Sequence, residues 1–168
     1  MVPSIARFEE TPLQEIGDRL GRYSVGQSGD AAEFIRWLCY SLPGQLVWLI
    51  GTEMSGGNSM DQVVVESISD SDHRRKLCAP IPTQLRPVSF EFGWIGSAEA
   101  DLHSKLGKPS GSRHSWQQFL FAGKVPLPYQ APGSKEPSTV EYDVMAYIEV
   151  KVAGGKVTAI RASRSTTY

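Results

Sequence analysis

Three acidic residues alternate along one stretch of the chain and are the first candidates for chemistry. Glu141, Asp143 and Glu149 lie in the segment VEYDVMAYIEVKV, residues 140–152. In an extended strand these side chains share one face, and their spacing allows two carboxylates about 7 Å apart, as in the acid and base pair of glycosidases. Any strand with one face in water shows the same alternation, so a solvated strand is the simpler interpretation.

The three histidines do not form a catalytic or metal-binding group in the sequence. His73 belongs to a short basic segment that we expect to be a solvated loop, His103 to a predicted helix, and His114 to the loop after that helix. No cysteine or carboxylate stands at a metal-ligand spacing from them. The motifs of serine hydrolases, phosphate-binding loops, zinc proteases and dinucleotide sites are also missing. We therefore expect no enzyme activity, no cofactor and no metal.

The composition argues against several classes of protein. Lys and Arg number 17 against 18 for Asp and Glu, a formal net charge of -1. This balance provides no overall field to attract a nucleic acid or an anionic membrane. No apolar run reaches the ~18 to 20 residues of a membrane span, and residues 1–10 lack the features of a signal peptide. We expect a soluble, cytoplasmic protein, with a periplasmic location as the alternative if a leader has been removed ahead of Met1.

The two cysteines leave two alternatives open. Cys39 and Cys78 are enough for one disulfide in an exported protein and too few for a structural zinc site on their own. In a reducing compartment they would remain thiols, Cys39 in an apolar strand and Cys78 in a Pro-rich connector. Their separation allows a bridge between the first half of the chain and the connection that follows it.

The sequence predicts two helices, each with an N-cap residue at its start and a glycine at its end. We expect these helices to position the strands that follow them. In residues 97–109, Ser97 is the expected N-cap and Gly107 the expected stop, with an apolar stripe between them. Residues 11–21 repeat this design, with Thr11 as the N-cap and Gly21 as the stop. Aligning the two glycines also aligns the two stripes, which indicates a tandem repeat.

Three strands are expected after each helix. They cover residues 33–42, 45–53 and 62–69 in the first half and 116–121, 140–152 and 156–164 in the second. Tight turns at Pro43-Gly44 and Gly154-Gly155 indicate hairpins. Residues 33–42 also have features of a helix start, but the hairpin is preferred. Residues 88–94 are expected to be a short strand or extended lead-in, and residues 124–138, with four prolines, a long irregular loop.

These elements predict an α+β fold in a single domain that covers residues 1–168. It would contain two repeats, about 8–70 and 88–168, each a helix plus a three-stranded antiparallel meander, with a Pro-rich connector at 71–87. Both repeats would share one curved sheet and place their helices on one face. An antiparallel sheet tolerates one solvated face, so the opposite face would be open for docking.

The entry to the second helix resembles a known family. Gly96-Ser97-Ala98-Glu99, then Leu102, Leu106-Gly107-Lys108-Pro109 and Trp116, is similar to the pattern of domains like the β-lactamase inhibitory protein and the small outer-membrane-assembly lipoproteins. The inhibitory protein is itself a tandem of two helix and sheet units. The resemblance implies a sheet platform whose concave face grips another protein.

The function predicted from these features is that of a protein-binding inhibitor. We expect a bacterial immunity protein that neutralises a cognate toxin or effector enzyme by occluding its active site. The predicted partner-binding residues are Glu141, Asp143, Met145, Tyr147, Glu149 and Lys151, with Trp48 as an extension of the surface or, equally, as a core residue. Aromatic and Met anchors inside a charged rim are typical of interfaces, and the acidic members suit a partner with a basic groove, such as a nuclease or a cell-wall hydrolase.

Two other functions remain open at this point. A small hydrolase or ligand-binding protein would have a pocket under residues 124–138, beside His114. An envelope assembly protein would carry a leader ahead of residue 1. An open, shallow sheet would count against the first of these alternatives.

Overall fold

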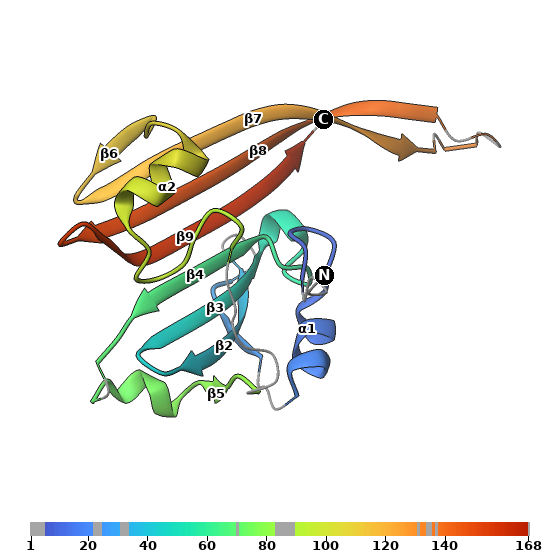
Figure 1. The fold of residues 1–168 in the computed structure, drawn as a ribbon. Coiled ribbons are helices and arrows are strands. Elements are labelled where there is room, and N and C mark those ends of the chain that lie inside the picture. Colours follow the sequence, from blue (N-terminus) through green and yellow to red (C-terminus); the bar gives the residue numbers. More distant parts are fainter. Residues whose placement is uncertain are drawn as a thin grey trace.

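One large sheet dominates the computed structural model of this protein (Figure 1). The structure describes residues 6–21, 25–30, 34–69, 71–82, 90–130, 132–133, 136 and 138–167. The strands are β1 (Gly26–Ser28), β2 (Ile35–Leu42), β3 (Gln45–Thr52), β4 (Gln62–Ser67), β5 (Ala79–Pro80), β6 (Gly111–Arg113), β7 (Trp116–Tyr129), β8 (Ser138–Ala153) and β9 (Lys156–Thr167). The α-helices are α1 (Leu13–Leu20) and α2 (Glu99–Leu106), and the 3-10 helices are η1 (Glu53–Ser55) and η2 (His73–Lys76).

The strands follow the spatial order β1-β2-β3-β4-β9-β8-β7-β6, and β5 pairs in parallel with β2 at one edge. Strands β2, β3 and β4 form one antiparallel meander, and β7, β8 and β9 form a second. The two meanders join where β4 pairs with β9, with Val64 opposite Arg161. The hairpins expected at Pro43-Gly44 and Gly154-Gly155 are confirmed.

The prediction of an α+β fold with helices on one face is wrong, because the described chain is mostly β. Each α-helix has 8 residues, whereas β7, β8 and β9 have 14, 16 and 12. Gly21 and Gly107, with φ of 87° and 81°, end the helices after about two turns. Such short helices do not form a layer over the long strands.

Both α-helices begin one residue later than they would if Thr11 and Ser97 were their N-caps. The N-cap positions are Pro12 and Ala98, and neither side chain makes a capping hydrogen bond. The hydroxyls of Thr11 and Ser97 instead accept from backbone N–H groups three or four residues upstream. The caps expected at these two residues are therefore wrong.

An equivalent backbone hydrogen bond holds the first residue of each α-helix. Leu13 N donates to Asn58 O at 2.8 Å, and Glu99 N donates to Gly155 O at 3.0 Å, so each helix is held by the turn before β4 or β9. This shared geometry is what a tandem repeat would produce. The division into repeats at about 8–70 and 88–168 stays a prediction.

Two clusters of buried side chains fill the space between the helices and the sheet. In the first, Ile16 and Leu20 of α1 pack on β2, β3 and β4. In the second, Leu102 of α2 packs on β7, β8 and β9. Phe8, Phe90 and Ile95 pack against both clusters and join them. The buried face of the sheet is thus the helix-side face.

The irregular loop expected at 124–138 is also wrong for its first part, because β7 continues through it. Lys124 pairs with Asp143, and the ladder runs on to Tyr129 opposite Ser138. Pro126 and Pro128 fit in this strand because β6 covers its other edge only at residues 116–118. Of the lead-in at 88–94, residues 88–89 lie outside the described residues, and 90–94 form only a Phe90–Gly93 bridge.

A disulfide joins Cys39 of β2 to Cys78, with the Cα atoms 4.8 Å apart. It ties the connector between the two halves to the edge of the sheet. The basic segment at 73–76, expected as a solvated loop, is the 3-10 helix η2, capped by Asp72. No helix in the described ranges has the length and apolar character needed to cross a bilayer.

Candidate protein-binding face

The face of the sheet opposite the helices, here called the outward face, brings together residues from both halves of the chain. Trp48 pairs with Val64, Val64 with Arg161, and Arg161 with Glu149. Directly paired residues of antiparallel strands point to the same side of the sheet. Trp48 therefore shares the outward face with the predicted binding residues of β8, two strands beyond its own partner.

Glu149 is the centre of a polar network on this face. Its Oε1 accepts from the Tyr147 hydroxyl and from the Gln118 side-chain amide, each at 3.1 Å. Its Oε2 lies 3.6 Å from Nη1 of Arg161. The carboxylate is 18% exposed, so these contacts hold it in one orientation. Burial, and then the hydrogen bond to Glu149, raise the pKa of Tyr147 above its usual 10.0, which keeps the hydroxyl a donor.

Arg161 also stacks on an aromatic ring. Its guanidinium carbon lies 4.6 Å from the centroid of the Trp116 ring, across β8. This distance is typical of a cation–π contact, and Arg is well suited to it because its guanidinium is planar. Arg161 thus links Glu149 to Trp116, and the three strands β7, β8 and β9 each supply one member of the group.

The other end of the outward face is held by the connector. Trp48 Nε1 donates to Glu66 Oε1 at 3.3 Å, and Arg74 of η2 binds the same oxygen at 2.7 Å. Arg74 also binds Asp72, and its hydrogen bonds lower the pKa of Asp72 to about 2. Both carboxylates raise the pKa of Arg74. Trp48 is half-buried, as are Trp116 and Tyr147, and its indole N–H is already bonded to Glu66 under the connector.

The predicted residues of β8 do not form one compact site. Tyr147, Glu149 and Lys151 lie beside the Trp116–Arg161 stack. Glu141 and Asp143 lie further along β8, roughly 20 Å away at about 3.3 Å per residue, where the sheet narrows to two strands. Exposed Met145 lies between these groups. Glu141 contacts Lys124 at 3.7 Å, and both are well exposed.

Sequence reasoning missed Trp116, Arg161, Gln118 and Leu120 as members of the outward face. The alternation in WQQFLF places Trp116, Gln118 and Leu120 on one side of a strand, so a signal for three of them was present. Leu120 is 50% exposed and lies opposite Tyr147. Arg161 is on this face only because of the register between β8 and β9, which the sequence does not display.

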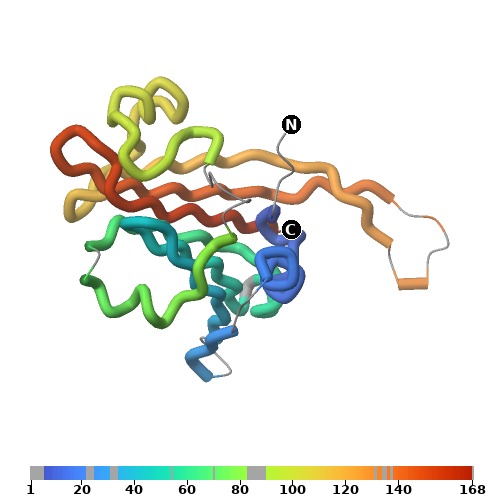
Figure 2. The backbone as a smooth tube through the Cα atoms, turned by 60° about the horizontal axis from the view of Figure 1, so that its bottom comes forward, coloured from blue at the N-terminus to red at the C-terminus, as the bar shows by residue number. Residues whose placement is uncertain are grey.

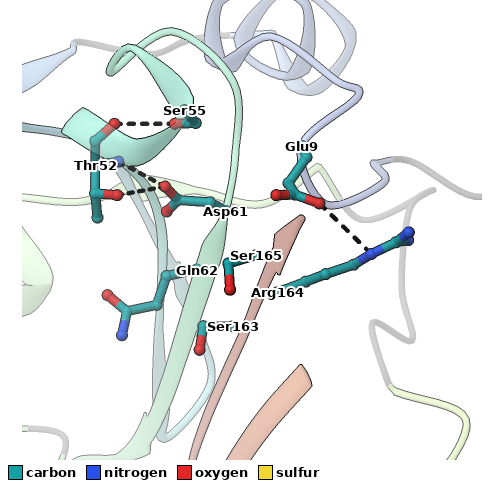
Figure 3. Close-up of a pocket in the computed structure, with 8 residues that line it drawn as sticks. All are labelled: Glu9, Thr52, Ser55, Asp61, Gln62, Ser163, Arg164 and Ser165. Atoms are coloured by element: carbon teal, nitrogen blue, oxygen red, sulfur yellow. Dashed lines mark hydrogen bonds and ion pairs between the residues drawn. The ribbon is translucent and has the colours of Figure 1, made fainter. Parts of the chain in front are cut away.

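A polar pocket of about 240 Å³ lies elsewhere, where β3, β4 and β9 meet the segment before α1 (Figure 3). It is lined by Glu9, Thr52, Ser55, Asp61, Gln62, Ser163, Arg164 and Ser165. Asp61 is 5% exposed and accepts from both the backbone N–H and the hydroxyl of Thr52. Glu9 accepts from Thr166 and faces Arg164 at 3.5 Å. These contacts tie the N-terminal segment to the sheet.

This pocket does not match the hydrolase alternative. Its described lining residues include serines but no histidine, which a serine nucleophile would need as a base. It does not lie beside His114, which occupies the turn between β6 and β7. In the described ranges, no three His, Cys, Asp or Glu side chains are grouped so that they could hold a metal ion.

No protein-family model, no curated protein and no solved structure matches this chain. The resemblance to proteins like the β-lactamase inhibitory protein therefore stays a prediction.

Proposed function

We propose that the chain is a protein-binding protein whose outward face docks a folded partner around Trp116, Tyr147 and Arg161. The observation that carries this proposal is the Arg161 stack on Trp116, joined to Tyr147 through Glu149. Trp, Tyr and Arg are the residue types that dominate binding energy in interfaces. Because these side chains are already held in place, little rotamer entropy would be lost on binding.

The specific form of the proposal is an inhibitor of the immunity type. The partner would be a toxin or effector enzyme whose active-site groove is covered by the sheet. The exposed carboxylates of Glu141 and Asp143 would face basic side chains at the rim of that groove. Met145 and Leu120, each 50% exposed, would add apolar area between the two ends.

The test is affinity for a cognate enzyme from the source organism, measured by calorimetry after the enzyme has been identified by co-purification. We expect Trp116→Ala to weaken binding by at least ~30-fold, which corresponds to about 2 kcal/mol. Lys156→Ala, at the exposed β8–β9 turn, is the matched control and should bind like the wild type. Equal binding by both variants would exclude the outward face.

The compartment we infer is an oxidising one, which is the periplasmic alternative rather than the cytoplasm. The support is the Cys39–Cys78 disulfide, since cytosolic thiols are normally kept reduced. Alkylation of free thiols in freshly lysed native cells, followed by mass spectrometry, tests this point. Labelling of both cysteines would contradict it.

A further inference from the structure

Strands β7 and β8 extend past the rest of the sheet as a two-stranded arm (Figures 1 and 2). The last residue of β9 in the ladder is Thr167, opposite Asp143. From Asp143 outward, residues 124–129 pair with residues 138–143, and of the described residues in these two ranges only Asp143 still has a partner in β9. These residues are called the arm. A two-stranded hairpin of this kind is at best marginally stable alone in water. Contact of one of its faces with another surface would therefore stabilise it.

The two faces of the arm differ in chemistry. The helix-side face continues the buried face of the sheet and carries Phe121, Val125, Leu127, Tyr129, Val140, Tyr142 and Val144, with Phe121 and Val144 at its base. None of these is charged. The other face of the arm carries Lys124, Glu141 and Asp143, as well as Pro126, Pro128 and Thr139. The arm is therefore amphipathic, and its apolar side is the side that lies against α2 elsewhere in the sheet.

This apolar face is open because α2 is much shorter than the strands. Phe119, which packs against the Leu102 cluster, is 1% exposed, whereas Phe121 on the same face is 41% exposed. Leu127 and Tyr129 further out are 39% and 41% exposed, and Val140 is 36% exposed. Contiguous apolar surface of this kind on a soluble protein marks a contact site.

The β7 edge of the arm does not suit pairing with another strand. The carbonyl of Gln118 accepts from Ser110 N, so it points away from β8. Backbone groups alternate in direction, so Pro126 and Pro128 occupy the same edge-facing positions. These two residues have no N–H to donate there, which blocks extension of the sheet. Addition of a strand at the β7 edge is therefore disfavoured, and the apolar face is the larger surface available for contact.

We propose that this apolar face docks on the same face of a second copy of the chain, with the two arms stacked to form a symmetric dimer. An uncharged face meets an identical face without like-charge repulsion, which is what a two-fold contact requires. Such faces pack ~10 Å apart, leaving the charged face of each arm in water.

The exposed parts of the seven side chains limit the area of a dimer interface. Residues 121–129 span about 30 Å of strand. Phe121, Leu127, Tyr129 and Val140 are 36% to 41% exposed and the other three side chains less, so each can lose ~70 Å² on average, and two copies together bury on the order of 1,000 Å². This is the minimum expected of a biological interface, so the dimer should be a weak one. The outward faces stay free in this arrangement, so each dimer would present two of them, which would add avidity toward a multivalent partner.

Neighbouring residues of β8 provide a matched test. Val140 and Thr139 are both exposed but point to opposite faces of the arm. In sedimentation velocity experiments over a range of concentrations, we expect the wild type and Thr139→Lys to have twice the mass of one chain. Val140→Lys should sediment as a monomer, with a dissociation constant raised at least ~30-fold. Tyr129→Lys, on the apolar face near the tip, is a second variant with the same expectation.

The dimer is overturned if the wild type remains a single chain up to ~1 mM, a concentration at which even a contact of only about 4 kcal/mol would associate to a large extent. It is also overturned if Thr139→Lys and Val140→Lys behave alike while both retain the wild-type circular dichroism. A monomer that binds phospholipid vesicles or a foreign protein through the arm would equally exclude the second copy as the occupant.

Discussion

The guanidinium of Arg161 in β9 stacks on the ring of Trp116 in β7, 4.6 Å from its centroid, and crosses the intervening strand β8 to do so. The same guanidinium lies 3.6 Å from Glu149. A planar cation between a carboxylate and an indole ring is held in one orientation, which suits recognition better than a freely rotating side chain.

Arg161→Lys should disrupt this stack while keeping the charge. A Lys ammonium lacks the planar fork, so it would not bind Glu149 and Trp116 together. Because the Arg161 side chain is 49% exposed, we expect the free energy of unfolding to change by less than about 1 kcal/mol. The near-UV circular dichroism of Trp116 should change in Arg161→Lys but not in the control Lys156→Arg, at the exposed β8–β9 turn. An unaltered spectrum in both would contradict the stack.

Tyr147 should titrate above its usual range in the folded protein. Its pKa is raised from 10.0 by burial and by the hydrogen bond to Glu149, so the folded state holds this proton more tightly than the unfolded state. The contribution to stability is complete below pH 10 and is lost as the pH rises through the folded pKa.

Absorbance titration of the phenolate measures this effect. In Glu149→Gln the pKa of Tyr147 should move back toward 10.0, because the contribution of the carboxylate is removed while burial remains. Tyr147→Phe should lose this component of the alkaline dependence of unfolding. A wild-type titration that shows no tyrosine above the usual range would refute the half-buried Tyr147–Glu149 contact.

Asp72 should titrate at about pH 2, because Arg74 donates hydrogen bonds to its carboxylate from both side chain and backbone. A depressed folded pKa means that its contribution to stability is present above the usual 3.8 and is lost as the pH falls toward 2. Carboxyl NMR of Arg74→Ala should show Asp72 closer to its ordinary pKa. Lys76→Ala, two residues along the same 3-10 helix, should leave the titration unchanged.

The Cys39–Cys78 disulfide should stabilise the fold by constraining the unfolded chain. With a sequence separation of 39 residues, loop-closure entropy gives about 4 kcal/mol as an upper expectation. The double variant Cys39→Ala/Cys78→Ala should lose about 2 to 4 kcal/mol in denaturant unfolding. Reductant should destabilise the wild type by a similar amount and leave the double variant unaffected.

Alanine substitutions of Phe119 and Phe121, on one face of β7, should differ in their cost in unfolding free energy because the buried core ends between them. Phe119 is 1% exposed and Phe121 is 41% exposed. Phe119→Ala should cost about 3 to 5 kcal/mol of unfolding free energy, while Phe121→Ala, at a protein concentration low enough to keep the chain monomeric, should cost roughly 1 kcal/mol or less. Equal losses would mean that the buried core continues past α2.

Some of this architecture is determined by the sequence alone. Glycines with positive φ end both α-helices near the expected residues, and tight turns produce the two hairpins. The period-two pattern of residues 140–152 assigns each side chain of β8 to the correct face. These features depend on local backbone preferences and on alternation within one strand, so neighbouring residues are sufficient to predict them.

Only the tertiary structure decided which parts of each face are covered. The sequence pattern predicts that Val140 and Tyr142 are core residues, yet they lie on the open arm because α2 ends long before β7 and β8 do. The sequence pattern predicts a loop at Pro126 and Pro128, yet both lie in β7, on an edge that pairs with no strand among the described residues. Trp48 and Glu149 share a face because β4 pairs with β9 in one register. Whether a helix covers a strand, whether a strand lies at the edge of the sheet, and how two strands are registered all depend on residues far apart in the chain. Local sequence patterns carry no information about these properties.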